Sequence, residues 1–278
     1  MTELEDRYLD RLSAWHVEVE RSFRTDSSIV ALGSRDEQRL VVKVVERPGD
    51  EWNSGAILHA FGGRGMVRVL DYVDGAMLLE RLDPGSPLVG IVLAGRDEEA
   101  TDIMANVIKR MTPDSPPPGT PSALELAKAF GQYRESGNRQ IPMELVAHAE
   151  EAYCELAASQ RNTKLLHGDL QHYNVLLDSK RGWLAIDPKG IVAEMEYEIG
   201  ASLRNPYEVP HILTSPRVIE RRIAQYTAAL GLDGYRVLKW GFSQAVLSAI
   251  WSVEDGDSVP PDSAPITLAR AIAPMLGS

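Results

Sequence analysis

Apolar and polar positions follow two different rhythms along this chain. In residues 1–80, short runs of β-branched and other apolar residues alternate with polar turns, which is typical of strands. In residues 88–278, apolar positions recur mainly at the spacing of amphipathic helices. The pattern therefore predicts an α+β protein with a small β-rich N-terminal part and a larger helical part. Residues 81–87, which are rich in Pro and Gly, are predicted to form a hinge.

The N-terminal part is expected to hold about five strands and one helix. Asp74 and Gly75 are a strong hairpin signal between two apolar runs. Asp50 is expected to cap a short helix that runs through Phe61. Residues 1–15 fit either a helix packed on the small part or a loose tail. The strands are predicted at residues 16–20, 29–32, 40–45, 67–73 and 76–80.

The C-terminal part is predicted to be mostly helical, with short strands around residues 164–186. Residues 111–121 contain five prolines and cannot be helical, and we favour a surface loop over a domain border there. The helices are predicted at residues 97–111, 122–135, 142–160, 216–230, 233–252 and 264–276. The strands are predicted at residues 164–166, 175–177 and 183–186.

Composition is that of an ordinary globular protein, with 44% hydrophobic and 25% charged residues among 278. The single cysteine, Cys154, excludes an internal disulfide and suits a reducing cytoplasm. We see no secretory signal and no run of about 18 apolar residues, so a cytoplasmic protein without a membrane span is expected. The net charge of −11 argues against nucleic acid, and it favours either a cationic substrate or simple solubility. No protein partner is implied.

Two acids and an amide follow short apolar runs in the second half of the chain. Asp169 precedes Asn174 by five positions, and Asp187 follows after thirteen more. A phosphoryl-transfer site needs one carboxylate facing a substrate hydroxyl, and an amide and a second carboxylate that share Mg²⁺. The spacing therefore predicts an ATP-dependent kinase, with Asp169 as the catalytic residue and with Asn174 and Asp187 as metal ligands.

The two histidines beside this cluster have other interpretations. His167 is expected to hold the loop backbone, and His172 is expected to face solvent. A rival hypothesis makes these histidines, with Asp169 and Asp187, ligands of a hydrolytic metal site. That hypothesis is weak because the chain has only 6 His and no second spaced cluster completes the shell.

Lys43 lies inside the apolar run 41–45, where a charge needs a partner. We expect it to contact the α- and β-phosphates of ATP, with Glu51 in the following helix holding it in place. The alternative is a lysine on a solvated strand face. Ser27 and Ser28, in a polar turn, are candidate contacts for the β- or γ-phosphate, although an ordinary turn would look the same.

The remaining candidates would bind the base of the nucleotide and the acceptor. Glu80 and Leu82 end the last N-terminal strand, where the backbone would pair with adenine. Acids further along the chain would suit an ammonium or guanidinium group, and a tryptophan would suit stacking on a sugar. Solvated surface acids and a core tryptophan are the alternatives. These tentative substrate residues are Glu194, Glu198, Trp251 and Asp255.

These residues carry a family resemblance. His-Gly-Asp-Leu-x-x-x-Asn at residues 167–174 and Ile-Asp-Pro at 186–188 resemble the aminoglycoside phosphotransferase branch of the protein-kinase-like fold. Residues 181–188, together with Glu194 and the segment 197–206, are similar to the streptomycin 6-kinase and hydroxyurea phosphotransferase group. The resemblance implies a two-lobed kinase with ATP in the cleft between the lobes, and it implies the roles already named for the acids, the amide and the lysine.

The resemblance also narrows the substrate. It implies phosphorylation of a hydroxyl on a small cationic molecule, with streptomycin first. Pro188 stands where protein kinases have the Phe of Asp-Phe-Gly, which makes protein substrates doubtful. Two alternatives stay open. One is a kinase for another small hydroxylated metabolite, such as an amino sugar, and the other is a catalytically silent nucleotide-binding regulatory module.

Overall fold

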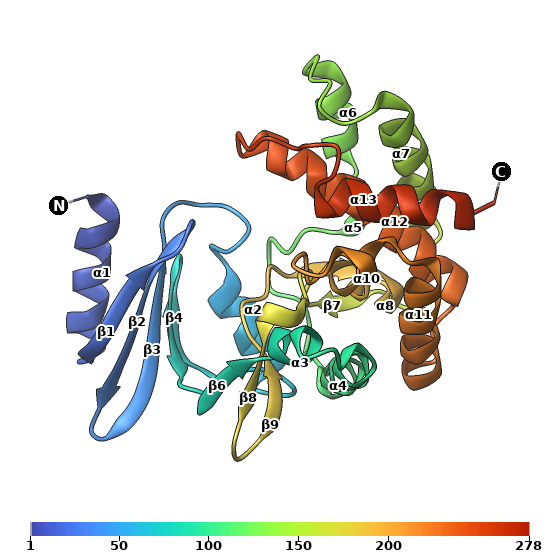
Figure 1. Cartoon of the computed structure of the whole chain (residues 1–278). Helices are drawn as coiled ribbons and strands as arrows, with labels where there is room; N and C mark the ends of the chain where they lie inside the picture. The colour runs from blue at the N-terminus through green and yellow to red at the C-terminus, as the bar shows by residue number, and fades with distance from the viewer. Residues whose placement is uncertain (1, 278) are drawn as a thin grey trace.

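The computed structural model of the chain describes residues 2–277 (Figure 1). A twisted antiparallel sheet and its covering helix, α1, lie at one end, and the longer helices gather at the other, with α2 between them. The predicted division into a β-rich N-terminal part and a helical C-terminal part is therefore confirmed. None of the helices in the described part of the chain is long and apolar enough to span a membrane.

The N-terminal sheet has the strand order β1-β2-β3-β5-β4, with every neighbouring pair antiparallel. Two-residue turns close the β2–β3 hairpin at Asp36–Glu37 and the β4–β5 hairpin at Asp74–Gly75, so the connection between β2 and β3 is shorter than the predicted strands 29–32 and 40–45 implied. Both residues of the first turn have positive φ, at 48° and 66°, as a tight hairpin between twisted strands requires. The strands are β1 (Glu18–Arg24), β2 (Ser28–Arg35), β3 (Gln38–Val45), β4 (Val69–Val73) and β5 (Ala76–Glu80).

The two faces of this sheet have different tasks. Because side chains alternate along a strand, Leu40, Val42 and Val44 of β3 point to one face and Lys43 points to the other. The first face packs against α1 (Glu3–Ala14), which begins with a capping box at Thr2. The open question about the N-terminus is thereby answered for the described residues: they form a helix on the outer side of the sheet, as Figure 1 shows.

The helix that follows β3 is shorter than predicted. α2 spans Ser54–Phe61 and not 50–61, because residues 50–53 form turns and the side chain of Asp50 is paired with Lys189 instead of capping the helix. Gly62 ends α2 in the left-handed region, at φ 56°, as the Gly-rich segment after Phe61 suggested.

All six predicted C-terminal helices are present, although the second is divided in two. Four short helices of four or five residues were missed, because one turn shows no periodicity in the sequence. Residues 112–121 are non-helical, as expected. The helices are α3 (Val89–Leu93), α4 (Asp97–Arg110), α5 (Ala123–Leu126), α6 (Lys128–Glu135), α7 (Met143–Ala158), η1 (His172–Asn174), α8 (Met195–Glu198), α9 (Gly200–Leu203), α10 (Pro210–Thr214), α11 (Pro216–Leu230), α12 (Gly234–Glu254), α13 (Ala264–Ile272) and η2 (Ala273–Met275).

Two small sheets lie within the helical part and carry the polar cluster. β6 (Pro84–Pro87) falls inside the predicted hinge and pairs with β8, which leaves residues 81–83 as the connection from β5. β10 also escaped prediction. The remaining strands are β7 (Lys164–Leu166), which pairs with β10 (Ile191–Ala193), and β8 (Val175–Asp178), which pairs with β9 (Gly182–Ala185).

One hydrophobic core runs from α2 through the helical part. Its central helix, α12, is buried on all sides over most of its length, whereas its last turn, at Glu254, is exposed. The segment before β4 is tied to β9 by two backbone hydrogen bonds. The Val67 N–H donates to the Ala185 carbonyl at 2.9 Å, and the Ala185 N–H donates to the Gly65 carbonyl at 2.9 Å. The sheet and the helical part are therefore joined by backbone as well as by packing.

A buried ion pair joins α4 to α11. Arg222 is 2% exposed, and it contacts the carboxylate of Asp97 and donates to the carbonyls of Ser202 and Asn205 at 3.0 and 2.9 Å. Because removing one partner leaves a buried charge unpaired, we predict that Asp97→Ala lowers the free energy of unfolding by about 3–5 kcal/mol. Urea denaturation at neutral pH measures this loss.

Glu99→Ala is the matched control. It breaks the exposed Arg96–Glu99 pair two positions further along the same helix, and it should cost less than about 1 kcal/mol. Equal losses in the two variants would show that the buried pair contributes no more than an exposed one.

Candidate active site

A cavity of about 750 Å³ lies against the inner face of the N-terminal sheet. One end is lined by charged and hydroxyl side chains, including Lys43, Glu51, Asp187 and Ser27. An apolar slot with a charged end fits a nucleotide, with the base in the slot and the phosphates at the charges. Its apolar walls include Val30, Val41, Met77, Leu79, Leu176 and Ile186.

The predicted adenine-binding segment lines the same cavity. Glu80 and Leu82 both lie in its wall, as expected. The Glu80 carboxylate is taken up elsewhere, since it accepts the Arg68 backbone N–H at 2.8 Å and forms an ion pair with Arg181. Its side chain therefore supports the wall and leaves base recognition to other groups.

Lys43 forms ion pairs with Glu51, as expected, and also with Asp187, which was predicted only as a metal ligand. Its Nζ lies 2.8 Å from Glu51 Oε2 and is in direct contact with Asp187 Oδ1. Burial alone would lower the pKa of Lys43, but Asp187 and Glu51 outweigh burial and raise it, so the ammonium stays charged. One detail of the prediction is wrong: Glu51 lies in the turn before α2 and not in the helix.

The two serines of the β1–β2 turn have different surroundings. Ser27 lines the cavity and donates its hydroxyl to Glu51, with Oγ 3.1 Å from Oε2. Ser28 is 1% exposed, and its Oγ lies 2.8 Å from Thr25 Oγ1 within the turn. The predicted phosphate contact of the Ser28 side chain is therefore corrected, because that hydroxyl closes the turn.

The loop after β7 carries Asp169, and the His167 ring stabilises this loop through two hydrogen bonds. The buried His167 ring has Nε2 2.8 Å from the Ile186 carbonyl, and its Nδ1 accepts the Asp169 N–H at 3.2 Å. Burial lowers the pKa of His167, which keeps the ring neutral. A neutral ring can donate from Nε2 to the Ile186 carbonyl and accept the Asp169 N–H at Nδ1. His172 was expected to face solvent, but it is buried, and burial together with Arg222 lowers its pKa well below the usual value.

Glu198 supports the same loop from another side. Its two carboxylate oxygens accept the backbone N–H groups of His167 at 2.7 Å and Gly168 at 3.2 Å. The side chain is 2% exposed, which is incompatible with its predicted substrate contact. We therefore correct that expectation: Glu198 positions the backbone of the loop that carries Asp169.

Glu194 also has a structural task. It is 1% exposed, forms an ion pair with Arg236 at 2.5 Å and accepts the indole N–H of Trp240 at 2.7 Å. A carboxylate occupied in this way cannot meet an acceptor. The predicted substrate contact of Glu194 is thus corrected as well, and the acid links β10 to α12.

The predicted metal ligands lie on adjacent segments. The Asn174 amide nitrogen donates to the Asp169 carbonyl at 3.0 Å, which leaves its oxygen available, and the Ile186 N–H donates to the Asn174 carbonyl at 2.9 Å. Asp187 follows directly. An amide oxygen and a carboxylate are ligands that suit Mg²⁺. Within residues 2–277, no group of three or more His, Cys, Asp and Glu side chains could hold a metal ion, so the rival hydrolytic site finds no support there.

Sequence reasoning missed Arg204. Its Nη2 lies 3.0 Å from Asp169 Oδ1, and both side chains are largely buried. Arg204 directly follows α9, 35 positions after Asp169, so local spacing carried no signal for the pair. The contact fixes the Asp169 carboxylate at the edge of a second hollow.

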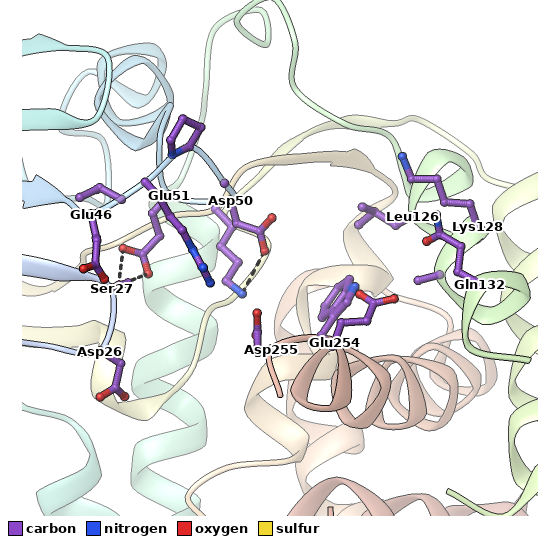
Figure 2. Close-up of a pocket in the computed structure, with 17 residues that line it drawn as sticks. Asp26, Ser27, Glu46, Asp50, Glu51, Leu126, Lys128, Gln132, Glu254 and Asp255 are labelled. Atoms are coloured by element: carbon purple, nitrogen blue, oxygen red, sulfur yellow. Dashed lines mark hydrogen bonds and ion pairs between the residues drawn. The ribbon is translucent and has the colours of Figure 1, made fainter. Parts of the chain in front are cut away.

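Two further hollows, of about 570 and 510 Å³, continue from the nucleotide cavity toward Asp169. The larger of the two, called the central hollow, shares Ser27 and Glu51 with the nucleotide cavity. Figure 2 shows Asp50 and Glu51 on one side of it and Glu254 and Asp255, at the end of α12, on the other. The smaller one lies beyond it and has Asp169 in its wall, and it is called the acceptor hollow.

The central and acceptor hollows have three lining residues in common: Lys189, Trp251 and Asp255. The structure thereby brings two of the four tentative substrate residues, Trp251 and Asp255, to the same hollow as Asp169. A continuous path leads from the phosphate end of the nucleotide cavity to the predicted catalytic carboxylate.

The buried acid beneath the loop should make stability depend on pH. Burial raises the pKa of Glu198 to about 7. The hydrogen bonds from the N–H groups of His167 and Gly168 lower this pKa, and so does the charge of Lys164. The charge of Asp169 raises it. The usual pKa of Glu is about 4.3, so between these values the folded protein binds more protons than the unfolded chain. The contribution of Glu198 to stability therefore falls as pH rises from about 4.5 to 7.

Glu198→Gln removes this titration and keeps an oxygen that accepts one of the two N–H groups. From pH 5 to pH 8, the free energy of unfolding of the native protein should fall relative to that of the variant by about 1–3 kcal/mol. Urea denaturation of both proteins at the two pH values tests this. A constant difference between them would mean that Glu198 has no raised pKa.

A sequence model of the family described as aminoglycoside/hydroxyurea antibiotic resistance kinase matches residues 14–256. The chain is 32% identical to a hydroxyurea phosphotransferase of Kitasatospora aureofaciens over 239 residues, which make up 80% of this chain and 66%, just under two thirds, of that relative. It is 30% identical to a streptomycin 6-kinase of Streptomyces griseus over 261 residues, 89% of this chain and 81% of that one.

The fold is also found among solved structures. A thermostable mutant of the aminoglycoside phosphotransferase APH(4)-Ia, in a ternary complex with ADP and hygromycin B, superposes with a TM-score of 0.68 at 13% identity and full coverage of both chains. The two-lobed protein-kinase-like fold is thereby confirmed. The chain belongs to the aminoglycoside/hydroxyurea antibiotic resistance kinase family, and it is a phosphotransferase that acts on hydroxyl groups.

Proposed function

We propose that the protein transfers the γ-phosphoryl group of ATP to a hydroxyl of an aminoglycoside, with streptomycin as the first candidate. The observation that carries the proposal is the continuous path from the Lys43–Glu51–Asp187 cluster to Asp169. The 30% identical streptomycin 6-kinase supports the choice of acceptor.

At the nucleotide end, Lys43 would contact the phosphates while Glu51 holds its ammonium in place. Ser27, hydrogen-bonded to Glu51, would add a hydroxyl beside them. Asn174 and Asp187 would hold Mg²⁺, which neutralises charge on the phosphate oxygens when it is bound. Asp187 also faces Lys43, so the two opposite charges stabilise each other before any nucleotide arrives.

At the acceptor end, Asp169 would orient the attacking hydroxyl and accept its proton. A bond forms from the hydroxyl oxygen to the γ-phosphorus, and the bond from that phosphorus to the bridging oxygen of ADP breaks. Arg204 and the Asn174 amide hold the carboxylate and the carbonyl of Asp169, so the base needs little rearrangement.

The wall opposite Asp50 suits a cationic acceptor. Burial raises the pKa of Glu254, and the charges of Asp255 and Asp50 raise it further, which reports repulsion among these acids. A guanidinium or ammonium group between them would relieve this repulsion. Trp251, beside them, would stack on a sugar ring or on the cation.

One observation favours a second acceptor class. The acceptor hollow itself is balanced in charge, with Asp169 and Asp255 against Lys189 and Arg204. A small neutral hydroxylated molecule would fit such a site, and a 32% identical relative is a hydroxyurea phosphotransferase. The two classes differ in their need for the acids at the end of α12.

We predict that Asp169→Asn lowers streptomycin-dependent ADP release by a factor on the order of 10²–10⁴, because it removes the proton acceptor. The affinity for Mg²⁺-ATP should stay within about twofold, since Asp169 lies at the acceptor end of the path. A coupled assay for ADP, together with calorimetry, measures both quantities. Lys43→Ala is the companion variant and should weaken nucleotide binding.

Near-native turnover in the Asp169→Asn variant would remove Asp169 from its assigned role. Silence of the native protein with streptomycin, combined with measurable Mg²⁺-ATP binding, would reject this acceptor and leave the nucleotide site standing. Nucleotide binding without ADP release across hydroxylated acceptors would instead favour a silent regulatory module.

Asp255→Asn distinguishes the two acceptor classes. Loss of one exposed charge should raise the KM for streptomycin about fivefold to tenfold, with kcat and the KM for ATP nearly unchanged. The KM for neutral hydroxyurea should not move. Asp257→Asn, on the same exposed segment and outside the acceptor hollow, is the control and should resemble the native protein. An equal response to both substitutions would mean that Asp255 makes no specific contact.

A further inference from the structure

The loop between β9 and β10 carries a lysine whose backbone position is fixed on both sides. The N–H groups of Lys189 and Gly190 both donate to the His167 carbonyl, at 3.0 and 2.9 Å, and the Pro188 carbonyl accepts the Ser54 hydroxyl at 2.7 Å. Gly190 packs closely against α2, since a Cβ at this position would lie 2.5 Å from Ile57 Cδ1. Lys189 therefore starts from a fixed point between Asp187 and the Asp169 loop.

The Lys189 side chain lies at the boundary between the two acceptor-side hollows and forms part of the wall of each. Its Nζ lies 3.4 Å from Asp50 Oδ2 and 5.7 Å from the ring centroid of Trp251. In the proposed function, this boundary lies between the nucleotide cavity and the hydroxyl that Asp169 would orient. Lys189 is thus close to the path of transfer and not merely on the rim.

The ion pair with Asp50 is easily exchanged. The Asp50 side chain is 69% exposed, and the Lys189 side chain is 35% exposed. Such an exposed pair contributes little to stability, so a phosphate oxygen can replace the carboxylate easily. The flexible four-carbon stem of lysine allows that exchange without movement of the backbone.

Lys189 differs from the other cations along the path in its position. Arg47 and Lys128 line only the central hollow, and Arg204, paired with Asp169, lines only the acceptor hollow. Lys43, paired with Glu51 and Asp187, lies in the nucleotide cavity. Among the described residues, Lys189 is therefore the cation that the two acceptor-side hollows share, where a positive charge can stabilise the transferring phosphoryl oxygens.

From these contacts we infer that Lys189 is a catalytic residue that binds the γ-phosphoryl group during transfer, exchanging Asp50 for its oxygens. The inference rests on the proposed function for the reaction that it serves. It concerns the nucleotide's terminal phosphate and not the identity of the acceptor, so it can be tested without any acceptor present.

The test compares two nucleotides that differ in that phosphate. Calorimetry with Mg²⁺-ADP and with the Mg²⁺ complex of the non-hydrolysable analogue AMP-PNP gives both dissociation constants. Lys189→Met should weaken AMP-PNP binding about tenfold and leave ADP binding within twofold, since only AMP-PNP carries the third phosphoryl group. Lys189→Arg should restore most of the lost affinity by restoring the charge. Lys109→Met, an exposed lysine on α4 that lies outside the hollows, should behave as the native protein.

Turnover gives a second readout. With an active acceptor, Lys189→Met should lower kcat by about 10²–10³, the usual loss when one group that stabilises the transition state is removed. Equal weakening of both nucleotides, or no weakening of either, overturns the assignment whatever the turnover. Selective loss of AMP-PNP affinity in a protein that phosphorylates neither streptomycin nor hydroxyurea upholds Lys189 and rejects only the proposed acceptors.

Discussion

The active-site geometry depends on a web of backbone hydrogen bonds between two loops, 167–174 and 186–190. The His167 carbonyl accepts two N–H groups from the second loop, its ring reaches the Ile186 carbonyl, and Ile186 returns a bond to Asn174. The buried Glu198 side chain adds to these bonds by accepting two N–H groups of the first loop. These paired backbone groups hold the two loops against each other, and that arrangement sets the separation of Asp169 from Asp187.

Local patterns in the sequence were enough to predict part of this site. A charge inside the apolar run 41–45 predicted a partner for Lys43, and Glu51 is such a partner in the structure. The spacing of Asp169, Asn174 and Asp187 after short apolar runs likewise indicated adjacent loops. Both inferences need only a strand and a turn.

The errors share a different cause. Glu194 and Glu198 look like solvated acids in sequence, yet each is buried against partners on other elements, Arg236 for the first and the catalytic loop for the second. Arg204 was missed for the same reason, since its partner lies 35 residues away. Ser28 was misassigned because a turn hydroxyl can face its own turn or a ligand with the same local sequence. Partners brought together only by tertiary structure leave no local signal.

The two parts of the long helix α12 have different roles. Its interior turns fill the core, while its last turn supplies Trp251, Glu254 and Asp255 to the acceptor side. Changes in an exposed last turn disturb few packed neighbours, whereas changes in the two catalytic loops would break their mutual hydrogen bonds. A substitution at the end of α12 can therefore reshape the wall that the two hollows share and leave the hydrogen bonds between the two loops intact.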